Sequence, residues 1–327
     1  MTLLPLLVLA LASPQQSAAT FQANVQWQEY VEVRYQGKEK QNAVGRFMTA
    51  YDISDPKKRE ETYKPYLHIL DPETGKPITK GAGGEFTHHR GIFIGWNKLT
   101  VNGKTYDRWH MVGGEQIVKE ATASHSLSSL GQSAAIHAPK IVWTGATRAE
   151  TLIEESRTMH FMPPPTGAFV QVDFSSELKA VGGDTIFDGD PEHAGLHFRP
   201  TDATDRANTL YLYPKADANA HKDRDYPWVG MTYTTEGNKY SVVMLSHPEN
   251  PTGTAWSAYR NYGRFGAFYK TAIKKDGTLK IQARFVVYKG ELPSPEAIQT
   301  LWNSYAKKKE MLFASTRKAA EQPAPKK

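Results

Sequence analysis

Residues 84–96 read Gly84-Glu-Phe-Thr-His-His-Arg-Gly-Ile-Phe-Ile-Gly-Trp96, and we expect the fold to be organised around this stretch. The apolar run after Arg90 is typical of a short buried strand, since it is rich in Ile and Phe and bounded by glycines. Such a strand would place the polar side chains of His88, His89 and Arg90 at its N-terminal end. Because side chains alternate along a strand, His88 and Arg90 would face one side and His89 the other. A buried histidine and a salt-bridged arginine with no chemical role remain the alternative.

A second polar cluster lies at residues 188–200, which read Asp188-Gly-Asp-Pro-Glu-His-Ala-Gly-Leu-His-Phe-Arg-Pro200. A strand from Gly195 onward would put His197 and Arg199 on one face. The preceding turn offers the acids Asp190 and Glu192 and the base His193. A histidine beside a carboxylate suits proton transfer near neutral pH. A polar turn that leads into a structural strand is the alternative.

Residues 256–266, Trp256-Ser-Ala-Tyr-Arg-Asn-Tyr-Gly-Arg-Phe-Gly266, interleave aromatic rings with Arg and Asn side chains. Rings such as Tyr262 can stack on the C–H face of a sugar, while groups such as Arg260 bind its hydroxyls. The pattern therefore suits a carbohydrate-binding face, although the same aromatic residues could belong to the core.

Short alternating or β-branched segments separated by turns run along most of the chain and predict an all-β fold. Asn102-Gly103 is the strongest hairpin signal, and this hairpin would bring residues 107–110 close to the first stretch. One helix is expected near the C-terminus, with Ser294 as its cap and Pro295 in its first turn. We expect a large antiparallel β-sandwich with one C-terminal helix, forming a single domain over residues 21–312.

The two ends of the chain differ from this body. Residues 1–19 combine an apolar run with a small-residue cleavage pattern and predict a signal peptide, hence an exported, periplasmic or extracellular protein. Residues 313–327 form a basic tail that we expect to be disordered. From residue 306 onward the chain carries +5 of the formal charge of +6, so the body is nearly neutral and nucleic-acid binding is not expected. No later segment is apolar enough to span a membrane.

The chain has no cysteine, which excludes disulfides, thiolate nucleophiles and cysteine-ligated metals. No helical His-Glu-x-x-His motif, Gly-x-Ser-x-Gly elbow or phosphate-binding loop occurs. Adjacent histidines on a strand rarely share one ion, because they face opposite ways. We therefore expect no cofactor, and an ion held by His193 and His197 is left open as the less favoured possibility.

Several of these segments resemble a family of exported bacterial proteins labelled methane oxygenase PmoA-like. The resemblance rests on Lys64-Pro-Tyr66, His88-His-Arg-Gly91, Glu155-Ser-Arg157, Gly195-Leu-His-Phe-Arg199 and His247-Pro-Glu-Asn-Pro251. A soluble β-rich chain does not fit the membrane subunit that the label describes. The resemblance implies export, a supersandwich like that of galactose mutarotase and the polysaccharide lyases, and a role among proteins that degrade glycans.

Together these patterns predict an exported carbohydrate-active enzyme that cleaves a glycosidic bond by β-elimination or hydrolysis, with a glycan as its substrate. A non-catalytic glycan-binding or envelope protein and a metal-dependent redox protein are the alternatives. The expected catalytic residues are His89, His193, Arg90 and Glu192. The expected substrate-binding residues are His88, Trp96, Trp109, Asp190, His197, Arg199, Arg260 and Tyr262. The sequence leaves open whether the two histidine clusters share one pocket.

Overall fold

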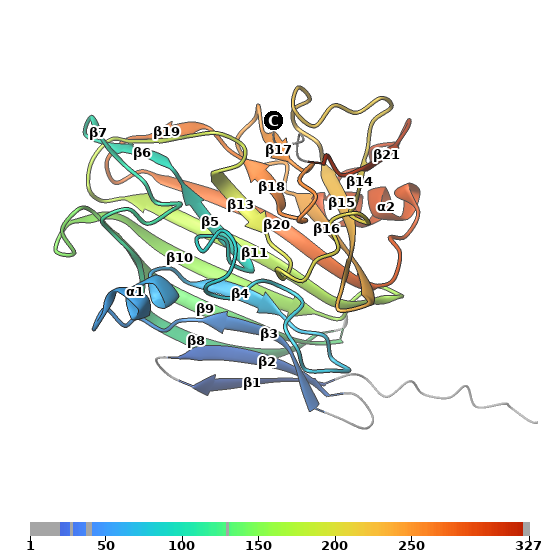
Figure 1. Ribbon diagram of the computed structural model, residues 1–327, viewed down its shortest axis with the longest axis horizontal. Coiled ribbons are helices and arrows are strands. Elements are labelled where there is room, and N and C mark those ends of the chain that lie inside the picture. Colours follow the sequence, from blue (N-terminus) through green and yellow to red (C-terminus); the bar gives the residue numbers. More distant parts are fainter. Residues whose placement is uncertain (1–19, 27–28, 37–40, 129–130, 323–327) are drawn as a thin grey trace, which may run out of the picture.

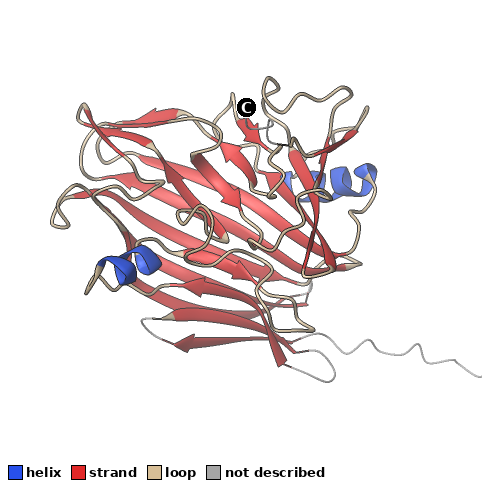
Figure 2. Ribbon diagram, viewed as in Figure 1, coloured by secondary structure: helices blue, strands red, loops and turns tan. Residues whose placement is uncertain are grey.

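Two large antiparallel sheets dominate the computed structural model, which describes residues 20–26, 29–36, 41–128 and 131–322 (Figures 1 and 2). The expected signal peptide lies outside these residues. The eight-stranded sheet contains, in spatial order, β1 (Thr20–Gln26), β2 (Tyr30–Gln36), β3 (Gln41–Met48), β4 (Tyr66–Ile69), β5 (Ile92–Trp96), β13 (Ala194–Phe198), β18 (Phe265–Phe268) and β17 (Ala255–Ser257).

The second sheet has nine strands, several of them long. They are, in order, β21 (Thr316–Ala319), β14 (Leu210–Tyr213), β15 (Trp228–Thr235), β16 (Asn238–Ser246), β20 (Thr278–Lys289), β11 (Ala168–Ala180), β10 (Thr151–Met162), β9 (Gly131–Thr144) and β8 (Gln116–Ser128). A smaller third sheet consists of β19 (Thr271–Ile273), β12 (Thr185–Asp188), β6 (Lys98–Val101) and β7 (Lys104–Tyr106). The expected all-β antiparallel sandwich is therefore confirmed.

The main core lies between the two large sheets, and the period-two alternation of each strand decides which side chains enter it. In β5, Ile92, Ile94 and Trp96 point into this core, whereas Phe93 points to the opposite face. There it packs with Trp109 and Tyr66 in a small separate cluster. The face of the eight-stranded sheet that carries Phe93 is the one on which the polar loops gather.

The C-terminal helix, α2 (Pro295–Ala306), begins as the sequence predicts. The Ser294 hydroxyl accepts a hydrogen bond from the backbone N–H of Ala297, and Pro295 opens the first turn. Ile298 and Trp302 bury the apolar stripe of the helix against the outer face of the nine-stranded sheet.

The expectation of a single helix is wrong, because α1 (Pro56–Thr62) also forms. It is short and charged and buries no residue, so it has no apolar periodicity by which to recognise it. Its start is nevertheless encoded locally: the Asp55 carboxylate accepts the N–H groups of Lys57 and Lys58, and a proline follows the cap.

The prediction of a disordered tail over residues 313–327 is wrong for the part that the structure describes. Thr316–Ala319 forms β21 and pairs with β14, which closes one edge of the nine-stranded sheet. Beyond this strand, Glu321 donates its backbone N–H to the carbonyl of Tyr259. The strand includes the basic residues Arg317 and Lys318, so it forms in spite of a composition typical of a solvated tail. Residues 323–327 lie outside the described part of the chain.

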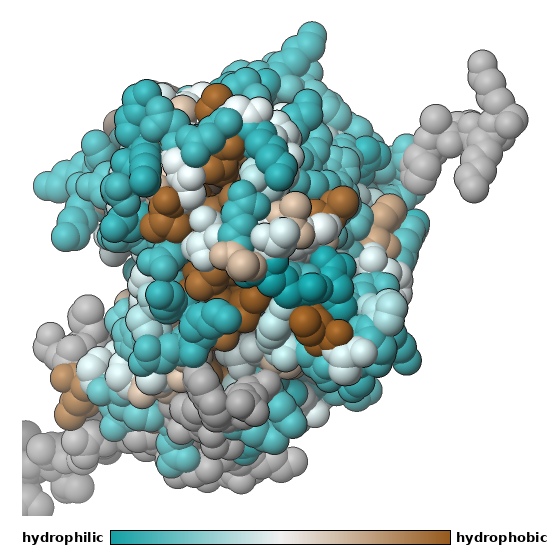
Figure 3. Space-filling view, turned by 90° about the vertical axis from the view of Figure 1, so that its left-hand side faces the viewer, coloured by the Kyte–Doolittle hydropathy of each residue, from teal (hydrophilic) through white to brown (hydrophobic). Residues whose placement is uncertain are grey.

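The surface is largely hydrophilic on the face shown in Figure 3, with small hydrophobic patches between the polar side chains. Among the residues that the structure describes, no helix has the length and apolar character needed to cross a membrane.

Candidate active site

Residues 84–91 form a loop, and the strand begins only at Ile92. Phe86 adopts a positive φ of 52°, and the N–H of His89 donates to the carbonyl of Phe86, which closes a tight turn. The prediction that His88 and His89 face opposite sides is therefore wrong, since a turn does not alternate its side chains. The two rings lie 4.3 Å apart, between centroids, on the same side of the sheet.

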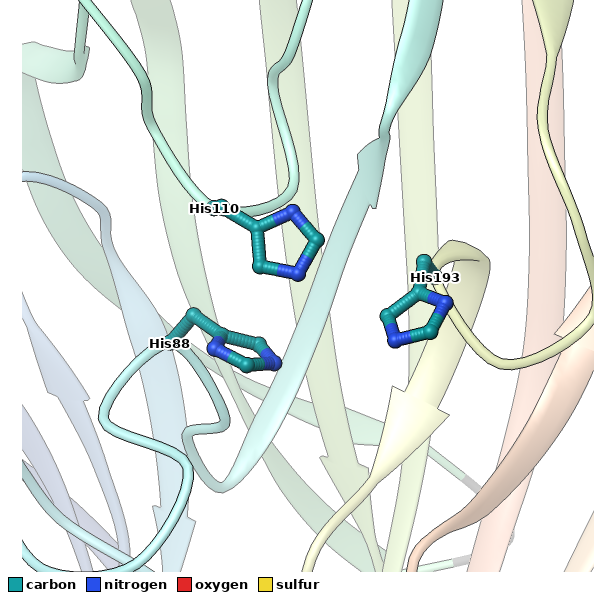
Figure 4. A group of neighbouring side chains, drawn as sticks. All are labelled: His88, His110 and His193. Atoms are coloured by element: carbon teal, nitrogen blue, oxygen red, sulfur yellow. The ribbon is translucent and has the colours of Figure 1, made fainter.

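The two histidine clusters of the sequence meet in space. Strands β5 and β13 are neighbours, and the ring centroids of His88 and His193 lie 6.4 Å apart. His110, from the turn after β7, forms a triangle with them, with its centroid 4.3 Å from that of His88 and 5.2 Å from that of His193 (Figure 4). One potential ligand nitrogen from each ring lies within 4.8 Å of the other two. This donor set could hold a transition-metal ion.

Two of these histidines are held by the same local motif, Asp-x-x-His. Asp107 accepts a 2.7 Å hydrogen bond from Nδ1 of His110, and Asp190 accepts one of 2.8 Å from Nδ1 of His193. Each aspartate also accepts backbone N–H groups of its own turn, at His110 and Trp109 in one case and at Glu192 in the other. Asn97 donates to the second oxygen of Asp190. The carboxylates thus fix both rings and leave their Nε2 atoms free.

Two facing glycines let neighbouring backbone approach β5 and β13 closely. Gly95 in β5 lies opposite Gly195 in β13. A Cβ atom at Gly95 would come within 2.2 Å of the carbonyl oxygen of Arg108, so only glycine allows the 107–110 turn to pack there. The N–H of Arg108 donates to the carbonyl of Trp96, which anchors this turn to β5.

A cavity of about 330 Å³ opens beside the three histidines, within the usual size range of ligand pockets. Its wall combines aromatic rings, charged groups and amides. It is lined by Glu85, Phe86, His88, His89, Glu192, His193, Arg206, Arg260, Asn261, Tyr262 and Glu321.

His89 is the most unusual group in this wall. Its side chain is 2% exposed, yet neither ring nitrogen has a hydrogen-bond partner. Tyr262 stacks parallel to it at 6.1 Å, and Trp109 meets it edge-on at 6.1 Å. Burial, the Arg264 guanidinium and the neighbouring His88 lower the pKa of His89 well below its ordinary value. A neutral imidazole with two unused nitrogens therefore borders the cavity.

Tyr262 is the centre of an aromatic and cationic group. The Phe86 ring lies 5.0 Å from it, and Phe86 is 40% exposed at the cavity. The guanidinium of Arg199 lies 4.8 Å from the Tyr262 ring centroid, on the buried side. Ring faces combined with guanidinium, carboxylate and amide groups suit the C–H faces and hydroxyls of a sugar.

Glu192 and Asp190, the carboxylates of the hydrolytic scheme, are both engaged. Glu192 is paired with Arg260, accepts a 2.8 Å hydrogen bond from the Tyr259 hydroxyl, and lies 3.6 Å from Nη2 of Arg264. Burial favours a higher pKa for Glu192, but these donors outweigh it and hold the pKa below its ordinary value. Glu192 is thus a carboxylate at neutral pH and a poor candidate for a general acid, while Asp190 orients His193.

Trp96, Trp109 and His197 lie away from the cavity wall. Trp96 points into the main core, where its indole N–H donates to the carbonyl of Tyr269. Trp109 and His197 meet edge-to-face beneath the site, with ring centroids 4.7 Å apart. His197 is bound to the carbonyl of Ala194 and to Arg264, so it is not a member of the three-histidine group.

Arg90 and Arg199, expected to stabilise an oxyanion, are fully buried among structural partners. Arg90 donates to the carbonyls of Glu60 and Gly81, and so ties α1 to the loop before β5. Arg199 donates to the Tyr262 carbonyl at 2.6 Å and to Asp202 at 2.7 Å. Neither lines the cavity, whereas Arg260 and Tyr262 do.

Six residues of the site were not predicted as functional: Glu85, Phe86, His110, Arg206, Asn261 and Glu321. His110 could have been found, because Asp107-Arg-Trp-His110 repeats the Asp-x-x-His spacing of Asp190-Pro-Glu-His193. Phe86, Arg206 and Glu321 carry no comparable signal. Glu321 comes from the segment expected to be disordered, and Arg206 is paired with Glu85 at the rim.

The fold and the site define an all-β sandwich protein with a polar, histidine-rich pocket on the outer face of one sheet. The chain belongs to a family of unknown function, DUF6807, whose sequence pattern matches residues 31–303. The resemblance to the family labelled methane oxygenase PmoA-like is thereby corrected, since nothing in the match supports that label.

Three solved structures share parts of the fold. A β-arabinopyranosidase gives a TM-score of 0.42 at 10% identity, over 75% of this chain and 38% of its own. A human-microbiome protein described as a kojibiose phosphorylase gives 0.34 at 7% identity, over 81% and 31%. A protein of Escherichia coli K12 described as an aldose 1-epimerase gives 0.31 at 10% identity, over 83% and 99%. This chain thus spans about a third of the first two proteins. No curated protein sequence matches it.

Proposed function

We propose that this chain is a carbohydrate-active enzyme that cleaves a glycosidic bond in the cavity beside His89. The observation that carries the proposal is the buried, neutral imidazole of His89, whose two nitrogens lack partners at the cavity wall. A buried polar group without a partner is costly, so such a group at a pocket is best explained by a ligand that completes its hydrogen bonds.

The surroundings of His89 favour a sugar as that ligand. Phe86 and Tyr262 offer ring faces, while Arg260 and Asn261 offer planar polar groups in the same wall. Sugars present both C–H faces and hydroxyls, and the wall provides a partner for each. A neutral imidazole can donate a hydrogen bond to a sugar oxygen without bringing a charge into the pocket.

The geometry favours β-elimination over hydrolysis by two carboxylates. Hydrolysis needs one carboxyl group as acid and a second as base or nucleophile. Here Asp190 is bound to His193 and Asn97, and Glu192 is bound to Arg260 and Tyr259. In elimination, a ring carbon beside a carboxylate or carbonyl loses a proton, the glycosidic C–O bond on the next carbon breaks, and the leaving oxygen takes up a proton. This chemistry requires no free carboxylate pair.

The test is a turnover screen of the purified protein on neutral and uronate-containing glycans. A reducing-end assay detects either type of cleavage, and ultraviolet absorbance of the new double bond detects elimination. We expect His89→Gln to lower kcat/KM by roughly 100-fold or more, the usual range for losing a catalytic proton-handling or polarising side chain. His137→Gln, in β9 of the other sheet, is the matched control and should leave turnover unchanged.

Full activity of His89→Gln would refute the assigned role. Binding of a glycan without turnover of any substrate would instead support the alternative of a non-catalytic glycan-binding protein.

A further inference from the structure

We propose that His88, His110 and His193 form a binding site for a divalent transition-metal ion of the zinc type. This inference goes beyond the proposed function and reverses the expectation that the protein needs no cofactor. Three observations support it: the three imidazoles converge, Asp107 and Asp190 hydrogen-bond two of them, and a cavity adjoins the group.

The convergence is the first argument. Three loops that are far apart in sequence each contribute one histidine, and one nitrogen of each ring lies within 4.8 Å of the other two (Figure 4). Nε2 of His88 is buried and has no hydrogen-bond partner. Zinc sites with three histidine ligands require about this arrangement, with modest closure to Zn–N distances of about 2.0–2.1 Å.

The carboxylates are the second argument. Metal-bound histidines usually donate their other ring N–H to a carboxylate or carbonyl, which fixes the tautomer and strengthens the ligand. Asp107 and Asp190 do this for His110 and His193, at 2.7 Å and 2.8 Å. Both aspartates are in turn held by backbone N–H groups. The repeated Asp-x-x-His turn thus presents two Nε2 atoms to one point.

The charge balance is the third argument. The carboxylates of Asp107 and Asp190 lie directly behind two of the imidazoles and offset the charge that an ion would bring. Imidazole nitrogens prefer zinc, copper, nickel and iron to magnesium or calcium.

The position of the cavity gives the ion a role. His88 and His193 line the cavity as well as the cluster, so a fourth coordination position would face the bound ligand. An ion bound by three histidines with one open position acts as a Lewis acid and lowers the pKa of a bound water. Within the proposed function, this would supply proton chemistry that neither Glu192 nor Asp190 is free to supply.

The test is titration of the chelator-treated full chain with Zn²⁺ by calorimetry, without any glycan. We expect one equivalent to bind to the wild type and to raise the midpoint of thermal unfolding. His110→Ala should abolish stoichiometric binding, and Asp107→Asn and Asp190→Asn should each weaken it by about 10–100-fold. His137→Gln is the control and should bind as the wild type does. Co²⁺ provides an independent readout through the visible absorption of a tetrahedral complex.

The conservative aspartate variants keep the test decisive if His110→Ala fails to fold. The proposal would be overturned if the wild type binds no Zn²⁺, or if all three variants bind it as tightly as the wild type. Because no substrate is involved, this outcome is separate from a failure of the proposed enzymatic function.

Discussion

Glu155 and Arg157 form an ion pair inside the sandwich, where both side chains are almost fully buried. The Glu155 carboxylate accepts two hydrogen bonds from Arg157, one from the Ser176 hydroxyl and one from the Trp143 indole. Each of the two Glu155 carboxylate oxygens thus accepts two hydrogen bonds. Removing one partner of such a pair leaves a buried charge without compensation.

We therefore predict that Glu155→Gln lowers the free energy of unfolding by about 3–5 kcal/mol. Glu154→Gln, one residue earlier on the opposite face, is the matched control: its pair with Lys140 is exposed, and its loss should cost less than about 1 kcal/mol. Urea denaturation of both variants measures the difference. Equal losses in the two variants would contradict the buried network.

His68 makes stability depend on pH. Burial and the charges of Arg46 and Arg90 lower its pKa from 6.5 to about 4. Between these two values the unfolded chain binds a proton that the folded chain does not, so stability falls as the pH falls. The contribution of His68 is complete above pH 6.5 and is lost progressively down to pH 4.

We predict that His68→Gln removes up to about 3 kcal/mol of the decline in unfolding free energy between pH 7 and pH 4. Denaturant unfolding at a series of pH values measures this slope. His137→Gln serves as the control for general histidine effects. A wild-type slope that survives in His68→Gln would show that other groups are responsible.

At the scale of the elements, β5 and the 107–110 turn depend on the missing side chain of Gly95. An added methyl group would lie 2.2 Å from the Arg108 carbonyl, which is backbone and cannot rotate away. We predict that Gly95→Ala lowers the free energy of unfolding by about 1–3 kcal/mol, as overpacking does in other cores.

Gly81→Ala is the matched control for Gly95→Ala. Its added Cβ meets nothing closer than 3.6 Å, in a loop that leads to the same strand. Thermal and urea unfolding of the two variants give the comparison. If Gly81→Ala is the more destabilised variant, the close approach of the turn to β5 does not set the stability of this element.

Local sequence signals determined several elements correctly. The Asn102-Gly103 hairpin forms between β6 and β7 with both residues at positive φ, as its turn chemistry requires. The capped start of α2 likewise follows from Ser294 and Pro295. Helix α1 has a local cap but no apolar periodicity, and β21 has the composition of a tail, so neither is predicted from sequence pattern. Contacts with distant parts of the chain stabilise both.

At the scale of the whole molecule, the candidate site is assembled by the sheet order. Pairing of β5 with β13 brings residues 88–89 and 193 together, and pairing of β6 with β7 returns the chain so that His110 joins them. The sequence indicated that these segments were polar and that the 107–110 turn would lie near β5. It could not show that β5 and β13 are neighbours, because strand order depends on contacts about 100 residues apart.

The same limit explains why single residues were misassigned. Arg90 and Trp96 lie in the most distinctive stretch of the sequence, yet Arg90 supports α1 and Trp96 fills the core. Strand alternation predicts that the two adjacent histidines point apart, whereas the turn at Phe86 places them together.

In our proposal three loops build one metal centre at the cavity, and anomalous X-ray scattering tests this most directly. Crystals grown with Zn²⁺ and measured on both sides of the zinc absorption edge should show a peak bonded to His88, His110 and His193 at about 2.0–2.1 Å. Zinc found only at surface sites, with the three imidazoles ordered and no peak between them, would contradict the account.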